Sequence, residues 1–562
     1  MNLTKLLVPF AVSASLAAQA EGPVVRPLPR LVVMISVDQL ATWVFEAALP
    51  HMGPNGFRRL IREGTWFREC SYAHACTETG PGHATLSTGA PASLHGIVKN
   101  QWFDPATGKK VYCSDDPEAQ ALEDMPEGAG KGAAQLRAPT VADVLKAHHG
   151  SAAKVVAVSW KDRGAILMGG NAADLAVWYD ASTGLPVTNR NYVDRTPDWL
   201  ARFRAGNPLD AKFGWKWERS GPESAYAGLV DDQPWETPHA NGLGQRTLPQ
   251  VVNGGKTVAG PEFYAQAYLS PLCSLMVHEL ALAALDGEEL GRDAVPDLFC
   301  ISYSGVDYVG HSFGPESVEA RDNMIRQDQL LAELLAKLDQ VVGVGNHVVL
   351  LSADHAVGPT PDFVVKSGGR AGRGPLLLRA RAAAEQALVE RFGARPEGAG
   401  RYITQASELS LYIDRAALPV KPGEDVEQVA AEAARIAARG AERAPNVMHA
   451  FPIADLMQEG PGEEPIRRAV HFALHPGRAG DVMVVFDPYH FDGSLTATHG
   501  SAHPYDREVP LFAMGPAIQR GRENVDPVTP GLMAVLAARL LRVPVPSSAV
   551  DRLPEDVLAT DR

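Results

Sequence analysis

The chain has 562 residues, of which 45% are hydrophobic and 21% are charged, and its formal net charge is −14. This composition excludes an intrinsically disordered chain and a collagen-like fibre. The acidic excess also argues against a nucleic-acid-binding surface, because phosphate backbones demand positive faces. It is compatible with small phosphorylated substrates, since a few local cations or metal ions reverse the sign of the potential inside a pocket.

The first 20 residues have the three-part pattern of a secretory signal peptide. Lys5 supplies a short positive segment, Leu6–Ala17 is apolar, and an AQA sequence ending at Ala20 fits a cleavage site. The apolar segment is too short to span a bilayer, and Pro9 disfavours a stable buried helix. We therefore predict cleavage after Ala20 and export to a bacterial periplasm, with no stable membrane insertion of the mature chain.

The five cysteines include no C-x-x-C pair, which argues against a structural zinc cluster. An exported protein can form disulfides, but five is an odd number, so at least one thiol is free or bonded outside the chain. Cys300 lies in an apolar run and is expected to be a buried thiol. The pairing of the others stays open.

Six short apolar runs, each followed at once by polar residues, are typical of buried parallel strands. Helical patterns lie between them, at about Glu316–Val342, Asp425–Arg443 and from Pro530 onward. This alternation predicts an α/β fold, with a doubly wound, mostly parallel sheet flanked by helices. The six runs are Leu31–Val37, Lys154–Ser159, Leu298–Tyr303, His347–Ser352, Asp481–Phe486 and Val509–Met514.

Two stretches interrupt this alternation. Residues from about 170 to 296 are rich in Trp, Pro and Gly, and residues from about 361 to 480 mix short strand-like and helical pieces. We interpret both as cap segments inserted into a single catalytic domain that spans residues 21–562.

Acidic and histidine residues follow four of the predicted strands. In α/β sheets, ligands bind just beyond the carboxyl ends of the strands, so these side chains are expected to meet at one edge. A lone Asp after a strand is usually structural, and the repetition is what favours a site. Three Asp and three His suit zinc, and can hold two ions with three protein ligands each. The six residues are Asp38, Asp307, His311, Asp354, His355 and His499.

A threonine precedes a turn that is typical of a helix start, in the sequence TGPGHAT. Pro81 fits the first turn of a helix, and Gly80 and Gly82 permit close backbone approach. Thr79 would then lie at a helix N-terminus, which favours an anion. A hydroxyl there, on a metal ion, is a competent nucleophile, although an ordinary helix cap has the same pattern.

Two cations follow the second predicted strand. Lys161 and Arg163 are two residues apart on an extended segment and therefore point the same way. They are suited to clamping phosphoryl oxygens, with Arg as a bidentate donor, although a solvated charge pair has the same spacing. Asn100, in the sequence VKNQW, is a further candidate.

Taken together, these motifs resemble those of the alkaline phosphatase superfamily. More narrowly, the chain is similar to the threonine-nucleophile, phosphate-irrepressible alkaline phosphatases of bacterial periplasms. The matching stretches occur in order over most of the mature chain. They are VVMISVDQ, TGPGHATLSTG, HGIVKNQWFD, SWKDRGAI, WYDASTG, SGVDYVGHSFGPES, LLSADH and ATHGSAHPYDREVPLF.

The resemblance implies an alkaline-phosphatase-like fold with two Zn²⁺ ions beside a nucleophilic threonine, and polar side chains that bind the non-bridging phosphoryl oxygens. One ion would be held by Asp307, His311 and His499, and the other by Asp38, Asp354 and His355. The nucleophile would be Thr79, in contact with the second ion, with Thr77 as the fallback. The phosphoryl-binding side chains would be Asn100, Lys161 and Arg163.

The activity that the resemblance implies is broad-specificity hydrolysis of small phosphate monoesters through a phospho-threonine, with an alkaline optimum and a side activity on diesters. We expect a monomer or weak oligomer. The alternative is an enzyme like the nucleotide pyrophosphatase/phosphodiesterases, which share the six ligands and the Thr but lack the Lys-x-Arg pair. Sulfatases of the superfamily carry C-x-P-x-R, whereas Cys76 is followed by TET. Relatives usually have Gly after the position of His355, where this chain has Ala356.

Overall fold

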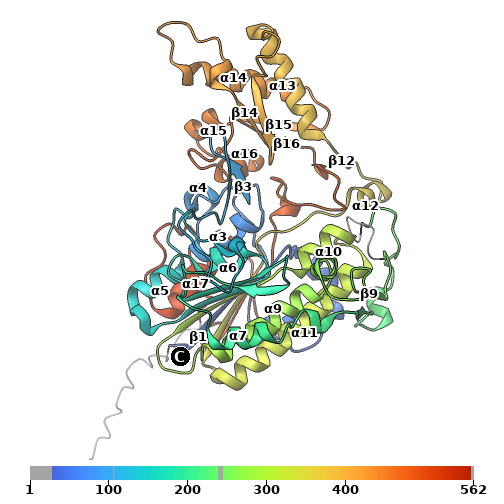
Figure 1. Ribbon diagram of the computed structural model, residues 1–562, viewed down its shortest axis with the longest axis vertical. Helices are drawn as coiled ribbons and strands as arrows, with labels where there is room; N and C mark the ends of the chain where they lie inside the picture. Colours follow the sequence, from blue (N-terminus) through green and yellow to red (C-terminus); the bar gives the residue numbers. More distant parts are fainter. Residues whose placement is uncertain (1–27, 106, 238–244, 559–562) are drawn as a thin grey trace, which may run out of the picture.

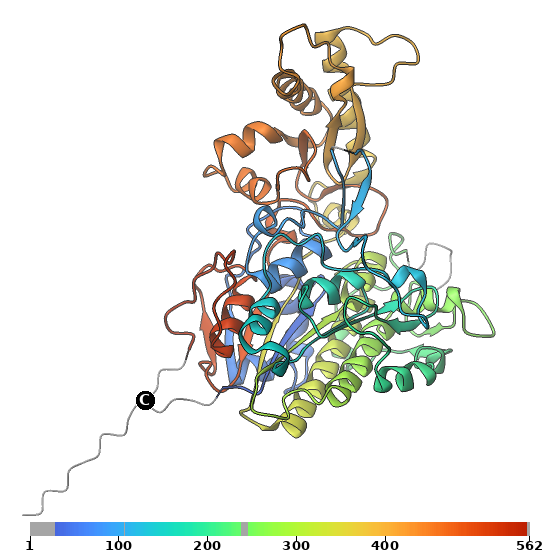
Figure 2. The ribbon, with the colours of Figure 1, turned by 60° about the vertical axis from the view of Figure 1, so that its left-hand side comes forward.

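The computed structural model describes residues 28–105, 107–237 and 245–558. The predicted signal peptide lies outside the described residues. Figures 1 and 2 show a sheet layered between helices, with a smaller lobe standing above the carboxyl ends of its central strands.

The core of the molecule is a nine-stranded sheet in the order β19-β2-β18-β11-β1-β10-β5-β6-β7. Its five central strands are parallel and almost wholly buried, because helices cover both faces. The predicted α/β fold is therefore confirmed. These strands are β1 (Leu31–Val37), β5 (Val155–Ser159), β6 (Leu175–Asp180), β10 (Asp297–Tyr303) and β11 (His347–Ser352).

The edges of this sheet differ from the prediction. The run predicted at Val509–Met514 forms β18 (Leu511–Met514), but this strand is antiparallel to both β11 and β2 (Gly64–Phe67). A short apolar run covered on both faces has the same pattern in either direction, so its sequence does not reveal its orientation. The outermost strands are β7 (Leu185–Val187), antiparallel to β6, and β19 (Arg522–Asn524), parallel to β2.

The prediction that Asp481–Phe486 is a core parallel strand is wrong. This run forms β16 (Val482–Phe486), which lies in a separate four-stranded antiparallel sheet. The sheet belongs to an accessory lobe (residues 376–486) with its own apolar core, at the top of Figure 1. The lobe also contains β13 (Ile403–Ser407), β14 (Ser410–Ile413), β15 (Val447–Pro452), α13 (Leu376–Phe392), α14 (Val426–Ala441), α15 (Ile453–Glu459) and α16 (Pro465–Phe472).

The helix α14 confirms the Ala-rich helix predicted at Asp425–Arg443. Asp425 caps it by accepting a hydrogen bond from the Glu427 amide at 3.0 Å. Its buried face is made of alanines, which let it pack closely on α13 and on the lobe sheet.

The stretch between residues 170 and 296 contributes to the core as well as to its cover. Strand β6 pairs with β5 inside the central sheet, and the largely buried helix α9 (Leu272–Gly287) packs on β10. Only the middle of the stretch lies outside the core, with the short strands β8 (Trp215–Trp217) and β9 (Gln250–Val252). Remaining helices there are α7 (Asp198–Ala205) and α8 (Pro261–Tyr268).

Helices that follow β10 bring the chain back along the sheet. α10 (Gly305–Phe313) is short. α11 (Val318–Leu338) covers most of the range predicted to be helical, Glu316–Val342. Ser317 caps α11 by accepting a hydrogen bond from the Ala320 amide at 3.0 Å. Beyond Leu338 the chain makes one π turn, Asp339–Gly343. The predicted C-terminal helix is α17 (Leu532–Leu541).

All five cysteines lie within the described residues, and all five are buried free thiols. The expectation for Cys300 is therefore confirmed. Within the described part of the chain, no single helix is long and apolar enough to cross a membrane; the bent pair α8–α9 passes by length and composition alone.

Candidate active site

Parallel strands bring the predicted acidic residues together. Asp38 follows β1, Asp354 and His355 follow β11, and Asp307 lies in the first turn of α10, which follows β10. Because β10 and β11 flank β1 on its two sides, these side chains meet at one edge, as predicted. His499 joins them by another route than predicted. It comes from a loop after β17 (His490–Asp492), not from the end of a core strand.

One group of three ligand atoms comes from Asp38, Asp354 and His355, and these atoms lie within 4.8 Å of one another. All three side chains are fully buried. Asp38 Oδ1, Asp354 Oδ2 and His355 Nε2 make no hydrogen bond of good geometry with a described residue. His355 Nε2 lies 3.2 Å from Asp38 Oδ1, and His83 Nδ1 lies 3.3 Å from Asp354 Oδ2. Unpartnered buried polar atoms are costly, and their convergence fits a bound cation. Two carboxylates and one imidazole suit a catalytic Zn²⁺.

A second group of mutually close ligand atoms comes from Asp307, His355 and His499. The His355 and His499 rings stack at 3.6 Å between centroids, so His355 stands between the two groups. The predicted ligand His311 lies beside them, with Nε2 3.0 Å from Asp307 Oδ1. The six predicted residues thus form one continuous cluster.

Backbone carbonyls orient all three imidazoles. Nδ1 of His311 lies 2.7 Å from the carbonyl oxygen of Ala497, and Nδ1 of His499 lies 2.8 Å from that of Thr77. His355 Nδ1 makes the same kind of contact with its neighbour's carbonyl at 3.2 Å. A proton on Nδ1 donates to the carbonyl and leaves Nε2 as a lone pair directed at the carboxylates, as metal ligation requires.

The Thr79 hydroxyl lies beside this cluster, at the first residue of α3 (Thr79–Thr88). Its Oγ accepts hydrogen bonds from Lys161 Nζ at 3.2 Å and from Arg163 Nη2 at 3.4 Å. Thr77 is placed differently, because its hydroxyl donates to the carbonyl of Asp506 at 2.9 Å and is fully buried. Of the two candidate threonines, Thr79 is therefore the one whose hydroxyl contacts Lys161 and Arg163.

Lys161 contacts both halves of the cluster. Its Nζ lies 2.5 Å from Asp38 Oδ2 and 2.6 Å from Asp307 Oδ2. Burial alone lowers the pKa of Lys161, but the two carboxylates outweigh it and hold the ammonium charged. Burial raises the pKa of Asp354 and the Asp38 charge adds to it, whereas Lys161 overcomes burial at Asp38 and lowers that pKa.

Arg163 and Asn100 are held by residues that the sequence did not single out. Arg163 Nη1 donates to Tyr112 Oη at 3.0 Å, and that hydroxyl donates to Asp162 at 2.7 Å. Asn100 Oδ1 accepts a hydrogen bond from the Gly80 backbone amide at 2.8 Å, and the backbone N–H of Asn100 donates to Glu78 Oε2 at 2.7 Å. The amide group of Asn100 is therefore anchored by its oxygen beside Thr79.

Gln39 also escaped sequence reasoning. Its Nε2 donates to Asp307 Oδ1 at 2.7 Å and its backbone amide lies 3.2 Å from Asp354 Oδ1, so it links the carboxylates of two strand ends. Its φ of 67° is unusual for a residue with a side chain. The only available signal was its position directly after Asp38.

Position 82 requires glycine because the turn lies against the backbone of Asp354, a close approach of the kind predicted from the sequence. A Cβ built on it would lie 1.9 Å from the Asp354 carbonyl oxygen. We expect Gly82→Ala to lower the free energy of unfolding by about 2–3 kcal/mol and to lower activity, because the ligand-bearing strand end must shift. Denaturant unfolding and turnover measure both effects. The matched control is Gly260→Ala, where the new Cβ meets no atom within 4 Å; equal effects of the two substitutions would refute the steric argument.

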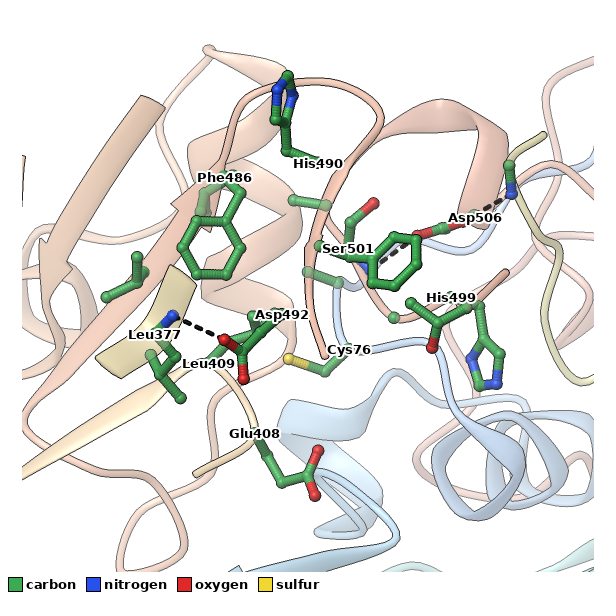
Figure 3. A pocket seen from close by; sticks show the side chains of 18 of the residues that line it. Cys76, Leu377, Glu408, Leu409, Phe486, His490, Asp492, His499, Ser501 and Asp506 are labelled. Atoms are coloured by element: carbon green, nitrogen blue, oxygen red, sulfur yellow. Dashed lines mark hydrogen bonds between the residues drawn. The ribbon is translucent and has the colours of Figure 1, made fainter. Parts of the chain in front are cut away.

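A cavity of about 390 Å³ opens beside His499, between the core and the accessory lobe. Figure 3 shows Glu408 and Phe486, from the lobe, and His499, from the core, among its lining residues. Glu78 also lines it; burial raises the pKa of Glu78 to about 7, and the nearby Glu408 charge adds to this. The wall is thus part aromatic and part acidic.

Sequence comparisons identify the family and its relatives. The sequence family described as type I phosphodiesterase / nucleotide pyrophosphatase matches residues 32–506. The chain is 29% identical to alkaline phosphatase PafA of Elizabethkingia meningoseptica, covering 97% of each chain. It is 28% identical to alkaline phosphatase PhoV of Synechococcus elongatus, covering 94% of this chain and 93% of that one.

Solved structures give the same result. The crystal structure of wild-type alkaline phosphatase PafA has a TM-score of 0.82 at 27% identity, covering 95% of this chain and 99% of that chain. Human ectonucleotide pyrophosphatase / phosphodiesterase 5 shares the fold alone, with a TM-score of 0.51 at 12% identity. The chain belongs to the type I phosphodiesterase / nucleotide pyrophosphatase family, as a PafA-like member of the alkaline phosphatase superfamily.

Proposed function

We propose that this protein is an alkaline phosphatase, a hydrolase of phosphate monoesters with Thr79 as its nucleophile. The observation that carries the proposal is the Thr79 hydroxyl, which lies at a helix N-terminus and contacts both Lys161 and Arg163 beside the carboxylate–histidine cluster. The relatives that match along nearly the whole chain, PafA and PhoV, are named alkaline phosphatases.

Two Zn²⁺ ions are the cofactor that we assign to the cluster. Asp38, Asp354 and His355 would hold one, and Asp307, His311 and His499 the other, as the resemblance implies. The buried ligand atoms of the first group that accept no hydrogen bond support the first assignment. Asp307 Oδ1 lies 3.0 Å from His311 Nε2 and 3.7 Å from His499 Nε2, which supports the second. When bound, such ions supply Lewis-acid stabilisation of negative charge on oxygen.

The side chains around Thr79 prepare it for attack on phosphorus. Hydrogen bonds from two cations and the N-terminus of α3 favour a negative charge on Oγ. Lys161 and Arg163 then lie where they can bind the equatorial oxygens, over which the charge of the transferring phosphoryl group is spread. Asn100, anchored by its carbonyl oxygen, has its amide nitrogen free to donate to the same group.

The leaving group of the ester would occupy the cavity beside His499. Its volume of about 390 Å³ accommodates a small leaving group, and aliphatic, aromatic and acidic side chains all contribute to its wall. This supports broad specificity for small phosphorylated molecules. Turnover should increase toward alkaline pH, because ligand histidines act as neutral imidazoles and the Thr79 hydroxyl must lose its proton.

Comparing p-nitrophenyl phosphate with bis(p-nitrophenyl) phosphate tests the assignment directly. We expect the monoester to give the larger kcat/KM. A larger value for the diester would overturn the proposal and favour the alternative of a phosphodiesterase.

Removing the charged side chains of Lys161 and Arg163 should lower the hydrolysis of monoesters more than that of diesters. We expect Lys161→Ala combined with Arg163→Ala to lower kcat/KM for the monoester by roughly 100-fold or more, and for the diester by about tenfold or less. The reason is that a monoester carries one more negative charge than a diester for the pair to neutralise. Parallel kinetics with both substrates measure the ratio, and equal losses would contradict the assigned role.

We also propose that the protein is exported to the periplasm after cleavage of residues 1–20. The sequence pattern around Ala20 is the support for this assignment. N-terminal sequencing of protein from a fractionated bacterial host should give Glu21 as the first residue, in the periplasmic fraction. An intact N-terminus in the cytoplasmic fraction would contradict it.

A further inference from the structure

A third group of carboxylates lies outside the candidate active site. One oxygen each of Asp231, Glu236 and Glu319 lies within 4.8 Å of the other two. Glu319 is in the first turn of α11 and is 0% exposed, and Glu236 is 3% exposed. Asp231 is partly exposed and comes from the same loop segment as Glu236.

The carboxylates of the two buried glutamates, Glu236 and Glu319, accept few hydrogen bonds from the described residues. Neither carboxylate oxygen of Glu319 accepts a hydrogen bond from another described residue, and the same holds for Glu236 Oε1. Glu236 Oε2 accepts one from the Gln233 amide at 3.1 Å. Three carboxylates at this separation repel one another, and the buried ones have lost their hydration.

The cations near the group lie on its outer side. Arg219 Nη2 contacts Asp231 Oδ2 at 3.2 Å, and Arg246 Nε contacts Asp232 Oδ1 at 3.0 Å. In the described part of the chain, no ion pair joins either arginine to Glu236 or Glu319. Burial, reinforced by the neighbouring carboxylates, raises the pKa of Glu319 to about 9 and that of Glu236 to about 8. At alkaline pH, Glu236 and Glu319 lose the protons that would otherwise neutralise their carboxylates.

We propose that Asp231, Glu236 and Glu319 form a binding site for one Ca²⁺ ion. The donor set is all carboxylate oxygen, with no His or Cys in the group, which suits a hard cation better than zinc. Two of the ligands come from a loop, which accommodates the irregular coordination of Ca²⁺ more readily than the strict octahedron of Mg²⁺. Both oxygens of Glu319 lack a hydrogen-bond partner among the described residues, so the Glu319 oxygen that belongs to the group would be available to ligate the ion.

This ion would fasten the loop of residues 229–237 to α11. The same loop contacts the segments that carry two candidate zinc ligands. The Thr237 amide donates to the carbonyl of Ser312, next to His311, at 2.7 Å. Thr496 Oγ, three residues before His499, donates to the carbonyl of Trp235 at 2.8 Å. The calcium would thus have a structural role, holding a loop that supports the active site from outside.

Calcium binding to the zinc-loaded, full-length protein tests the proposal. After exhaustive dialysis against calcium-free buffer that contains Zn²⁺, protein with and without millimolar CaCl₂ is compared by thermal unfolding, and bound calcium is counted by elemental analysis. We expect one Ca²⁺ per chain and a rise in the unfolding midpoint of about 3 °C or more. Both effects should be larger at about pH 9 than at about pH 5, because protons compete for Glu236 and Glu319.

Two isosteric variants and a control make the test specific. Glu319→Gln and Glu236→Gln should each weaken Ca²⁺ binding by at least about tenfold, because each removes a charged ligand. Asp232→Asn, a neighbouring acid outside the group, should bind as the wild type does. The proposal is overturned if wild-type protein binds no stoichiometric calcium, if the glutamine variants bind it normally, or if Mg²⁺ binds more tightly than Ca²⁺. None of these readouts uses phosphatase activity, so the result is independent of the proposed function.

Discussion

Thr79→Ala is expected to lower turnover of phosphate monoesters by at least about 10³-fold while zinc content and folding stay unchanged. The structure places this hydroxyl in contact with both Lys161 and Arg163, at 3.2 and 3.4 Å. Its removal takes away the covalent route but leaves all six proposed metal ligands in place. Turnover of p-nitrophenyl phosphate, with zinc measured on the same samples, gives the result.

Thr77→Ala is the matched control for this substitution. The Thr77 hydroxyl donates to a backbone carbonyl, and only the backbone oxygen of Thr77 contacts His499. Losing the hydroxyl should therefore reduce activity far less than losing that of Thr79. Full turnover in the Thr79 variant, or a greater loss in the Thr77 variant, would show that the nucleophile is misassigned.

Chelation of the metal is expected to have the second largest effect. Dialysis against EDTA should abolish turnover, and Zn²⁺ should restore it in proportion to binding, up to two ions per chain. Without a metal ion, the Asp38 and Asp307 carboxylates lie beside Lys161, and their negative charge opposes the approach of a phosphate dianion.

The two proposed kinds of metal site can be separated in this experiment. Zinc alone should restore turnover, whereas calcium alone should restore only the thermal stability attributed to the group of Asp231, Glu236 and Glu319. Full activity in protein that holds no detectable metal would refute the two-zinc assignment.

The candidate site was largely predictable because most of it follows one rule. Asp38, Asp354 and His355 come just after parallel strands, and Asp307 lies in the first turn of the helix that follows a third strand. Neighbouring parallel strands end at the same edge of a sheet. Thr79 was predictable from the helix-start pattern that follows it. His499 was identified correctly as part of the cluster, but the strand thought to deliver it belongs to the accessory lobe.

The errors in the fold have a common cause. β16 and β18 are short, apolar and buried, so their sequences resemble those of the central parallel strands, but they pair antiparallel in a different sheet or at a different edge. Pairing partners are set by long-range contacts that a local pattern does not contain. In the same way, Gln39 acts through Asp307, far along the chain, and its place in the stretch VVMISVDQ did not reveal that contact.

The carboxylate group proposed to bind calcium was also invisible in the sequence. Glu236 and Glu319 are 83 positions apart in the printed sequence and belong to no recognisable motif. Each looks like an ordinary surface glutamate until folding buries both side chains against each other. Close approach of unpartnered buried charges is a property of the tertiary structure alone.

X-ray anomalous scattering at the zinc edge, from crystals grown with zinc and orthovanadate, tests most directly whether residues from Asp38 to His499 build one metal-assisted site around a threonine. We predict two zinc peaks per chain, one among Asp38, Asp354 and His355 and one beside Asp307 and His499, with the vanadium bonded to Thr79 Oγ. Zinc peaks elsewhere, or vanadate bound away from Thr79, would contradict the account.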